Sequence, residues 1–281
     1  MRAYLYISSL LISLAISGFT GVFEQLSRLW ILPVSYIGVF LLQYVVFFIF
    51  LWLWSLTVDT SKPQEKESPF CRFLTRQAIA LVVPRLMKIH TTGTEKIPKK
   101  GRFLLVSNHL FDLDPVVFLK CFPKSQLTFV SKRENKKLFM ISKYMHKLIC
   151  PFINRENDRE ALKSILRCIQ ILKDDLASIV VFPEGHIYKS DRKLHHFRNG
   201  VFKIAQRAKV PIVVCTLKNT QYIKENLRRL KRTHVYMDLL TVIEPEQYRG
   251  LNTVELGEQI YNLMAQHLGP ENVSTEKRTI L

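Results

Sequence analysis

The sequence predicts an α/β protein with a mixed, largely parallel sheet flanked by helices, preceded by an N-terminal two-helix membrane hairpin. Two long apolar runs without any charge, residues 3–23 and 30–58, stand at the N-terminus. After them, short β-rich runs alternate with helical patterns, which is typical of a parallel sheet. Hydrophobic residues make up 48% of the 281 residues, and this share excludes a wholly disordered chain.

Residues 1–58 are predicted to form a membrane-anchoring hydrophobic hairpin. At about 1.5 Å of rise per residue, each apolar run can form a helix that crosses roughly 30 Å of hydrocarbon. The connector at 24–29 is very short, so the runs could be two spanning helices or a hairpin that enters from one face. A cleaved signal peptide is the alternative, but it would leave the second run unexplained and no cleavage site stands out.

Polar and basic residues follow the hairpin. Residues 59–68 are predicted to be a linker and residues 69–281 a single folded domain. The basic residues at this flank favour a cytoplasmic location for both ends of the hairpin and for the domain, by the positive-inside rule. They are Lys62, Lys66, Arg72 and Arg76.

The patterning of the domain predicts its elements in order. Residues 70–88 form a helix broken near Pro84. The predicted strands are residues 103–106, 127–130, 179–182, 212–216 and 235–243. The predicted later helices are residues 162–172, behind a capping box that begins at Asn157, then 197–209 and 254–267.

Charge and cysteine content narrow the class of protein. Nearly all of the formal net charge of +18 lies after Val58, since only Arg2, Glu24 and Arg28 precede it. Residues 136–148 and 224–232 are basic stretches that could lie on an anionic membrane surface or be solvated helix faces. The five cysteines form no C-x-x-C pair, which favours buried reduced thiols in a cytoplasmic domain.

The strongest candidate for chemistry is the segment 107–115, directly after the predicted strand 103–106. Open α/β sheets place their sites at such strand ends. His109 can act as a general base near neutral pH if a carboxylate holds its other ring nitrogen. Asp114 could do so only if the chain turns, because residues five apart on a helix point about 140° away from each other. Otherwise Asp114 simply caps the helix that Pro115 begins.

Two further segments could contribute to the same site. Phe182-Pro183-Glu184-Gly185 follows a predicted strand, where its carboxylate could line a polar acceptor site or merely form a turn. Arg155 precedes the capped helix, where it could bind a phosphate or pair with a neighbouring acidic residue.

In their order and spacing these blocks resemble the glycerolipid acyltransferase family of the 1-acyl-sn-glycerol-3-phosphate acyltransferase (PlsC) type. The resemblance covers roughly residues 85–245. The matching blocks are N-H-x4-D at Asn108-His109 to Asp114, F-I-x-R at Phe152, Ile153 and Arg155, F-P-E-G at Phe182 to Gly185, and a proline-centred block at Val210-Pro211-Ile212. The flanks that also agree are residues 93–98, Ser131-Lys132-Arg133-Glu134 and Phe197-Arg198-Asn199-Gly200.

The resemblance implies an enzyme that transfers a fatty acyl group from acyl-CoA or acyl-carrier protein to the free hydroxyl of a lysoglycerolipid. The default acceptor is 1-acyl-glycerol-3-phosphate, which gives phosphatidic acid in phospholipid biosynthesis. His109 would take the hydroxyl proton and Asp114 would orient the imidazolium. The implied partners are membrane phospholipid, the lysophospholipid acceptor and the donor, with no metal, other cofactor or nucleic acid.

The resemblance also implies a substrate-binding set. Its members are Asn108, Lys132, Arg155, Glu184, Gly185 and Lys189. One departure concerns the third block, which in the family commonly continues with Thr-Arg, whose arginine helps to bind the acceptor phosphate. Here His186-Ile187 follow, so that Lys189 or Arg192 substitutes or the acceptor differs. The other acceptors are glycerol-3-phosphate, another lysophospholipid and a lyso-aminolipid.

Two other classes of protein compete with this interpretation. The basic domain could bind nucleic acid, although no binding motif is present. A metal-dependent hydrolase could use His109, Asp112 and Asp114, but a second ligand cluster is missing. His195 and His196 are adjacent and would point apart in an extended chain.

Overall fold

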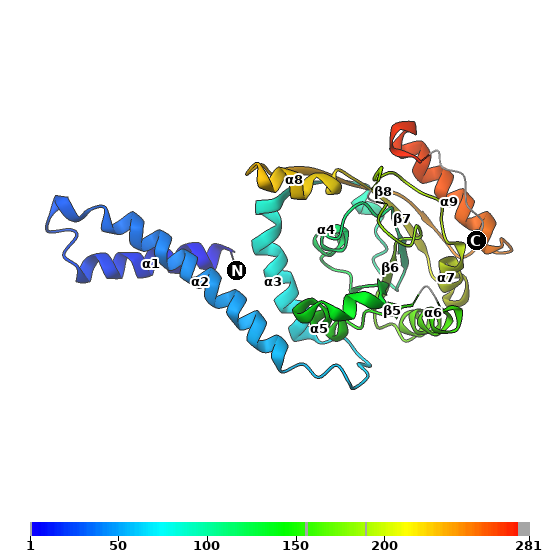
Figure 1. Cartoon of the computed structure of the whole chain (residues 1–281), viewed down its shortest axis with the longest axis horizontal. Coiled ribbons are helices and arrows are strands. Elements are labelled where there is room, and N and C mark those ends of the chain that lie inside the picture. Colours follow the sequence, from blue (N-terminus) through cyan, green and yellow to red (C-terminus); the bar gives the residue numbers. More distant parts are fainter. Residues whose placement is uncertain (1, 155–156, 189, 275–281) are drawn as a thin grey trace.

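Two apolar helices, α1 (Arg2–Phe19) and α2 (Ile31–Leu56), form a hairpin that projects from the rest of the molecule (Figure 1). The computed structural model describes residues 2–154, 157–188 and 190–274. Ser9, Ser13 and Ser17 recur every fourth residue of α1 and are fully buried. Ser13 Oγ lies 2.8 Å from Ser35 Oγ of α2, because small side chains let the two helices approach closely.

The two helices of the hairpin are not equally suited to span a membrane. In the described part of the chain, residues 26–56 alone are long and apolar enough to cross a membrane, with a mean hydropathy of 2.3. The apolar part of α1 is shorter. The second half of α2 also packs on the domain, where Arg85 lies 4.7 Å from the ring centre of Tyr44 and the Tyr144 hydroxyl donates to Leu51 O. That half of α2 is therefore partly covered by the domain.

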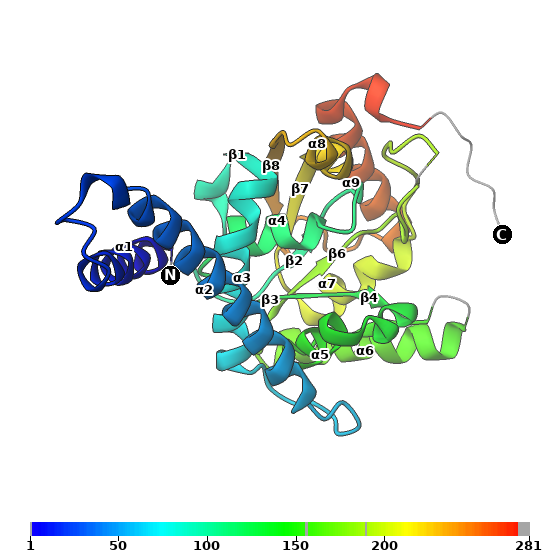
Figure 2. The same cartoon turned by 60° about the vertical axis from the view of Figure 1, so that its left-hand side comes forward.

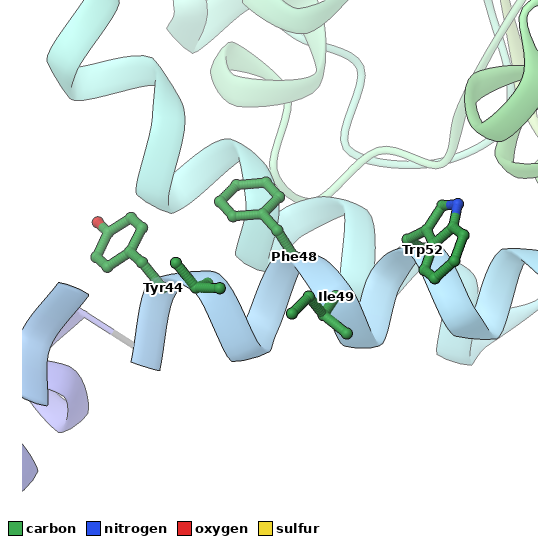
Figure 3. A pocket seen from close by; sticks show the side chains of 5 residues that line it. Tyr44, Phe48, Ile49 and Trp52 are labelled. Carbon is green, nitrogen blue, oxygen red and sulfur yellow. The ribbon is translucent and has the colours of Figure 1, made fainter. Parts of the chain in front are cut away.

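An apolar groove runs along α2 beside helix α3 (Pro69–Leu86) (Figure 3). Helix α5 (Phe139–Lys147) also packs on α2, and Trp54 of α2 touches both Phe70 of α3 and Tyr144 of α5, with ring centres 5.7 and 5.1 Å apart. The residues that line the groove are Tyr44, Val45, Phe48, Ile49 and Trp52. The groove lies on the hairpin, away from the sheet.

The sheet confirms the predicted mixed, largely parallel architecture. Six strands are arranged in the order β1-β8-β7-β2-β6-β3, and β7–β8 is its one antiparallel pair in the described residues. Their bounds are β1 Met87–Thr92, β2 Leu104–Val106, β3 Leu127–Phe129, β6 Ser178–Val181, β7 Ile212–Lys218 and β8 Thr233–Ile243. A separate parallel pair is formed by β4 (Ser131–Lys132) and β5 (Phe152–Ile153).

Some boundaries differ from the prediction. Helix α3 continues through Pro84 and ends at Leu86, because a proline near the end of a helix removes one hydrogen bond without stopping the last turn. Met87 then begins strand β1, which the sequence did not predict. Its side chains alternate only weakly in polarity, and it forms the edge of the sheet beside β8.

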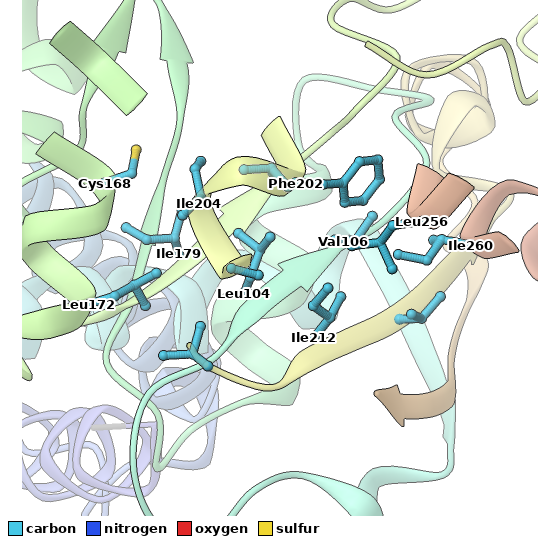
Figure 4. Close-up of a cluster of buried hydrophobic side chains, with 14 of the residues drawn as sticks. Leu104, Val106, Cys168, Leu172, Ile179, Phe202, Ile204, Ile212, Leu256 and Ile260 are labelled. Carbon is cyan, nitrogen blue, oxygen red and sulfur yellow. The ribbon is translucent and has the colours of Figure 1, made fainter. Parts of the chain in front are cut away.

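Helices cover both faces of the sheet, which explains why the inner strands are apolar throughout. On one face, Leu104 and Val106 of β2 pack with residues of three helices (Figure 4). On the other, Leu105 packs with residues of α3 and α4. The remaining helices are α4 Asp114–Cys121, α6 Asp158–Lys173, α7 Lys203–Ala208, α8 Ile223–Arg228 and α9 Thr253–Leu268. Helices α6, α7 and α9 cover the first of these two faces.

Three neighbouring parallel strands end at the same edge of the sheet. Strands β2, β6 and β3 lie side by side (Figure 2). The chain leaves them into the segments that carry His109, Glu184 and Lys132 respectively. The fold therefore gathers two of the sequence blocks and one of the matching flanks at one edge, where α/β folds generally place their sites.

Candidate active site

The loop after β2 brings His109 and Asp114 together. Nδ1 of His109 lies 2.9 Å from Oδ2 of Asp114. The same oxygen accepts the main-chain N–H groups of Leu110 and Phe111, at 2.7 and 2.9 Å. Asp114 is the first residue of α4, yet its carboxylate reaches back over the turn and does not cap the helix. The chain therefore makes the turn between His109 and Asp114 that allows the two side chains to meet.

The surroundings of the pair determine which ring nitrogen of His109 can act as the base. Asp114 is fully buried, whereas the His109 side chain is 18% exposed. The His109 ring stacks on Phe182, with centroids 4.1 Å apart and planes within 14°. With Nδ1–H donated to the carboxylate, Nε2 carries the free lone pair, and this atom makes no hydrogen bond with any described residue. The arrangement is that of an oriented general base.

Glu184 holds the main chain of His109. Its side chain is buried, Oε1 accepts the His109 N–H at 2.8 Å and Oε2 accepts the His195 N–H at 3.1 Å. Burial raises the pKa of Glu184 to about 8, although both hydrogen bonds favour its charged form. The residue sits in a tight turn in which Gly185 N–H donates to Phe182 O at 3.0 Å. The Glu184 carboxyl group therefore joins the loop that carries His109 to the loop that carries His195.

Asn108 holds the same loop from the other side. Its Oδ1 accepts the Leu217 N–H at 2.8 Å and its Nδ2 donates to Leu217 O at 2.9 Å. The side chain thereby pairs with the main chain of β7, and it is buried. The polar atoms of Asn108 and Glu184 are thus engaged by the protein itself, and a direct contact of either residue with substrate stays a prediction.

The other predicted site residues lie as follows. Lys132 is exposed at the end of β4, directly opposite Ile153 of the F-I-x-R block. Gly185 closes the turn beside Glu184 with a φ of +86°, a conformation that favours glycine. Arg155 and Lys189 lie outside the described residues.

Sequence reasoning missed a second histidine–aspartate pair. His195 is buried, its Nε2 lies 2.8 Å from Oδ1 of Asp191, and its ring stacks on Tyr188 at 3.4 Å between centroids. The neighbouring His196 instead stacks on Tyr261. The spacing of an aspartate and a histidine four residues apart, Asp191 and His195, was the available signal. Its main-chain link to Glu184 could not be seen in the sequence.

The arrangement gives no support to a metal centre. Within residues 2–154, 157–188 and 190–274, no three His, Cys, Asp or Glu side chains converge in a way that could hold an ion. The fold and the His109–Asp114 pair together define an α/β enzyme equipped to move a proton at the carboxyl edge of its sheet.

Comparison with known proteins identifies the family. The model of the Acyltransferase family matches residues 88–218. A probable 1-acyl-sn-glycerol-3-phosphate acyltransferase of Mycoplasma genitalium is 33% identical, covering 68% of this chain and 74% of the relative. The corresponding protein of Mycoplasma pneumoniae is 30% identical, with coverages of 64% and 71%. This chain belongs to the acyltransferase family that includes these proteins, and it is an acyltransferase.

A solved structure agrees with the fold. The crystal structure of the 1-acyl-sn-glycerophosphate acyltransferase PlsC from Thermotoga maritima superimposes with a TM-score of 0.59, covering 94% of this chain and 96% of that protein. The sequence identity is 18%, so the likeness concerns the fold. It includes the N-terminal region as well as the α/β domain.

Proposed function

We propose that this enzyme transfers a fatty acyl group from acyl-CoA or acyl-carrier protein to the free hydroxyl of 1-acyl-glycerol-3-phosphate, giving phosphatidic acid for phospholipid synthesis. The hydrogen bond between His109 and Asp114 is the observation that carries the proposal. The names of the Mycoplasma relatives support this acceptor. No metal or other cofactor takes part in the proposed reaction.

The proposed mechanism is direct transfer. Nε2 of His109 takes the proton of the acceptor hydroxyl while its oxygen attacks the thioester carbonyl. The carbon–sulfur bond breaks, and the thiolate leaves with the proton that the imidazolium returns. Buried Asp114 stabilises the imidazolium and keeps Nε2 as the basic atom. Glu184 and Asn108 hold the loop in register with β6 and β7.

We further propose that residues 1–58 anchor the enzyme, residues 59–68 connect it and residues 69–281 form the catalytic domain on the cytoplasmic face. Apolar side chains of α3, of α5 and of the residue before α5 are exposed beside the hairpin and support contact with lipid. They are Phe70, Phe73, Leu138, Phe139 and Ile141. A membrane-bound enzyme meets its lipid acceptor at this surface.

An acceptor panel tests the proposal. The full-length protein in detergent receives labelled acyl-CoA or acyl-carrier protein together with one acceptor at a time. We expect transfer to 1-acyl-glycerol-3-phosphate. Transfer only to glycerol-3-phosphate, another lysophospholipid or a lyso-aminolipid would contradict the proposed acceptor and retain the mechanism. No transfer to any acceptor by folded protein would contradict the proposed function.

A further inference from the structure

Arg198 covers the turn that holds the catalytic loop. Its main-chain N–H donates to Pro183 O at 2.8 Å. A Cβ atom placed on Gly185 would lie 2.9 Å from Nε of Arg198 and 3.0 Å from its Cδ. The positive φ favours glycine at 185, and the Arg198 side chain lies against the face of this residue that has no Cβ. The structure thus places the guanidinium directly over the F-P-E-G turn.

The charge of this guanidinium is not neutralised within the described protein. Arg198 is exposed and forms no salt bridge or side-chain hydrogen bond with any described residue. Both oxygens of nearby Glu184 already accept main-chain N–H groups, and burial raises the pKa of this carboxyl group to about 8. By contrast, Arg192 on the same loop donates from Nη1 to Gln221 O at 2.9 Å. Arg198 therefore has donors available for an external anion.

Arg198 lies over the same turn that contacts His109, the residue proposed to bind the reacting hydroxyl. Phe182, at the start of the turn, stacks on the His109 ring, and Glu184 holds the His109 main chain. Gly185, beneath the Arg198 side chain, is the next residue of the same turn. In 1-acyl-glycerol-3-phosphate the free hydroxyl and the phosphate sit on adjacent carbons. A hydroxyl directed at His109 therefore brings the phosphate close to this turn.

We propose that Arg198 binds the phosphate group of the acceptor and so determines acceptor specificity. The inference rests on the function proposed above and gives a role to Arg198, which the sequence comparison named only as part of a matching flank. It accounts for the absence of an arginine directly after Gly185, where His186-Ile187 stand. A guanidinium can form two parallel charge-assisted hydrogen bonds with a phosphate.

The test compares Arg198→Gln with Arg198→Lys and with Arg207→Gln, which removes an exposed arginine from α7. The full-length enzymes are assayed with 1-acyl-glycerol-3-phosphate and acyl-CoA, each varied in turn. We expect Arg198→Gln to raise the acceptor KM about tenfold or more, with a smaller change in kcat and no change in the acyl-CoA KM. Arg198→Lys recovers part of the loss, and Arg207→Gln behaves as the wild type.

A binding measurement separates this inference from the proposed function. Full-length His109→Ala protein, with and without Arg198→Gln, is titrated with 1-acyl-glycerol-3-phosphate and with the monoacylglycerol that lacks the phosphate. We expect Arg198→Gln to weaken binding of the phosphate-bearing lipid about tenfold and to leave the other unchanged.

The outcomes are distinct. If Arg198→Gln equals Arg207→Gln in kinetics and binding, or raises only the acyl-CoA KM, the inference is wrong and the proposed function stands. If the wild type transfers no acyl group to this lipid but binds it in an Arg198-dependent way, the proposed function is wrong, and of the inference only the binding of the phosphate by Arg198 stands. If the folded wild type neither transfers to this acceptor nor binds it, both are wrong.

Discussion

Oε1 of Glu184 accepts a hydrogen bond from the main-chain N–H of His109 at 2.8 Å. Residues from two separate sequence blocks are thus joined through the backbone of one and the side chain of the other. Asp114 holds the imidazole ring of His109, and Glu184 holds the peptide that carries it. The orientation of the base therefore depends on two buried carboxyl groups with different tasks.

Removal of the Asp114 charge is predicted to reduce turnover. In Asp114→Asn the imidazolium loses its buried counter-charge, so kcat should fall roughly 100-fold or more while KM changes only a few-fold. Asp112→Asn, at an exposed position two residues earlier, is the matched control and should retain activity. Steady-state kinetics of both variants give the kcat and KM values that test this prediction. Equal losses in the two would contradict a special role for Asp114 and would favour a site that uses both aspartates.

Ionisation of Glu184 is predicted to reduce stability. Its pKa rises from the ordinary value of 4.5 to about 8 because the carboxyl group is buried. Between these two values the folded protein keeps a proton that the unfolded chain has released. The free energy of unfolding therefore falls with rising pH, by up to about 1.4 kcal/mol per pH unit.

Glu184→Gln provides the test, because an amide does not ionise. Denaturant or thermal unfolding is measured at pH 5, 6.5 and 8. The stability of the wild type relative to that of Glu184→Gln should decline as the pH rises. Glu258→Gln, at an exposed position of α9, should follow the wild-type curve. Parallel curves for the wild type and Glu184→Gln would contradict a buried carboxyl group that holds its proton.

Basic residues beside the exposed apolar patch are predicted to strengthen binding to anionic membranes. The basic segment contains Lys136, Lys137, Lys143 and Lys147, of which Lys147 donates to Gln64 Oε1. The double substitution of exposed Lys136 and Lys137 by Gln should weaken binding to anionic vesicles about 30-fold, at about 1 kcal/mol per lysine. Activity in neutral micelles should change little.

A matched double substitution controls for net charge. Lys99 and Lys100 are adjacent and exposed on a loop, so replacing both by Gln removes the same charge elsewhere. Vesicle co-sedimentation of the two double variants measures the difference. Equal weakening would show a general charge effect and not a specific membrane-facing surface.

Local patterns predicted most of the fold. Continuous apolar strands such as residues 212–216 and the capped helix behind Asn157 are encoded by nearby residues, and the structure contains β7 and α6 there. Strand β1 was missed because it is an edge strand next to an apolar helix, with weak alternation. The two-residue strands β4 and β5 are too short to carry a pattern.

The site could be predicted less completely. His109 and Asp114 were named, but their meeting depends on a turn stabilised by N–H groups of Leu110 and Phe111. Glu184 was placed in a turn without its partners, because His109 lies far from it in sequence and is brought near only by the parallel pairing of β2 and β6. Tertiary contacts of this kind leave no local signal.

The central claim is that Nε2 of His109 removes the proton of the acceptor hydroxyl. The most direct test is the initial rate of acyl transfer to 1-acyl-glycerol-3-phosphate by full-length wild type, His109→Ala and His90→Ala. His90 lies on β1 at the far edge of the sheet. We expect a loss of roughly 100-fold or more for His109→Ala and near-normal activity for His90→Ala. A folded His109→Ala enzyme with near-normal turnover would contradict the claim.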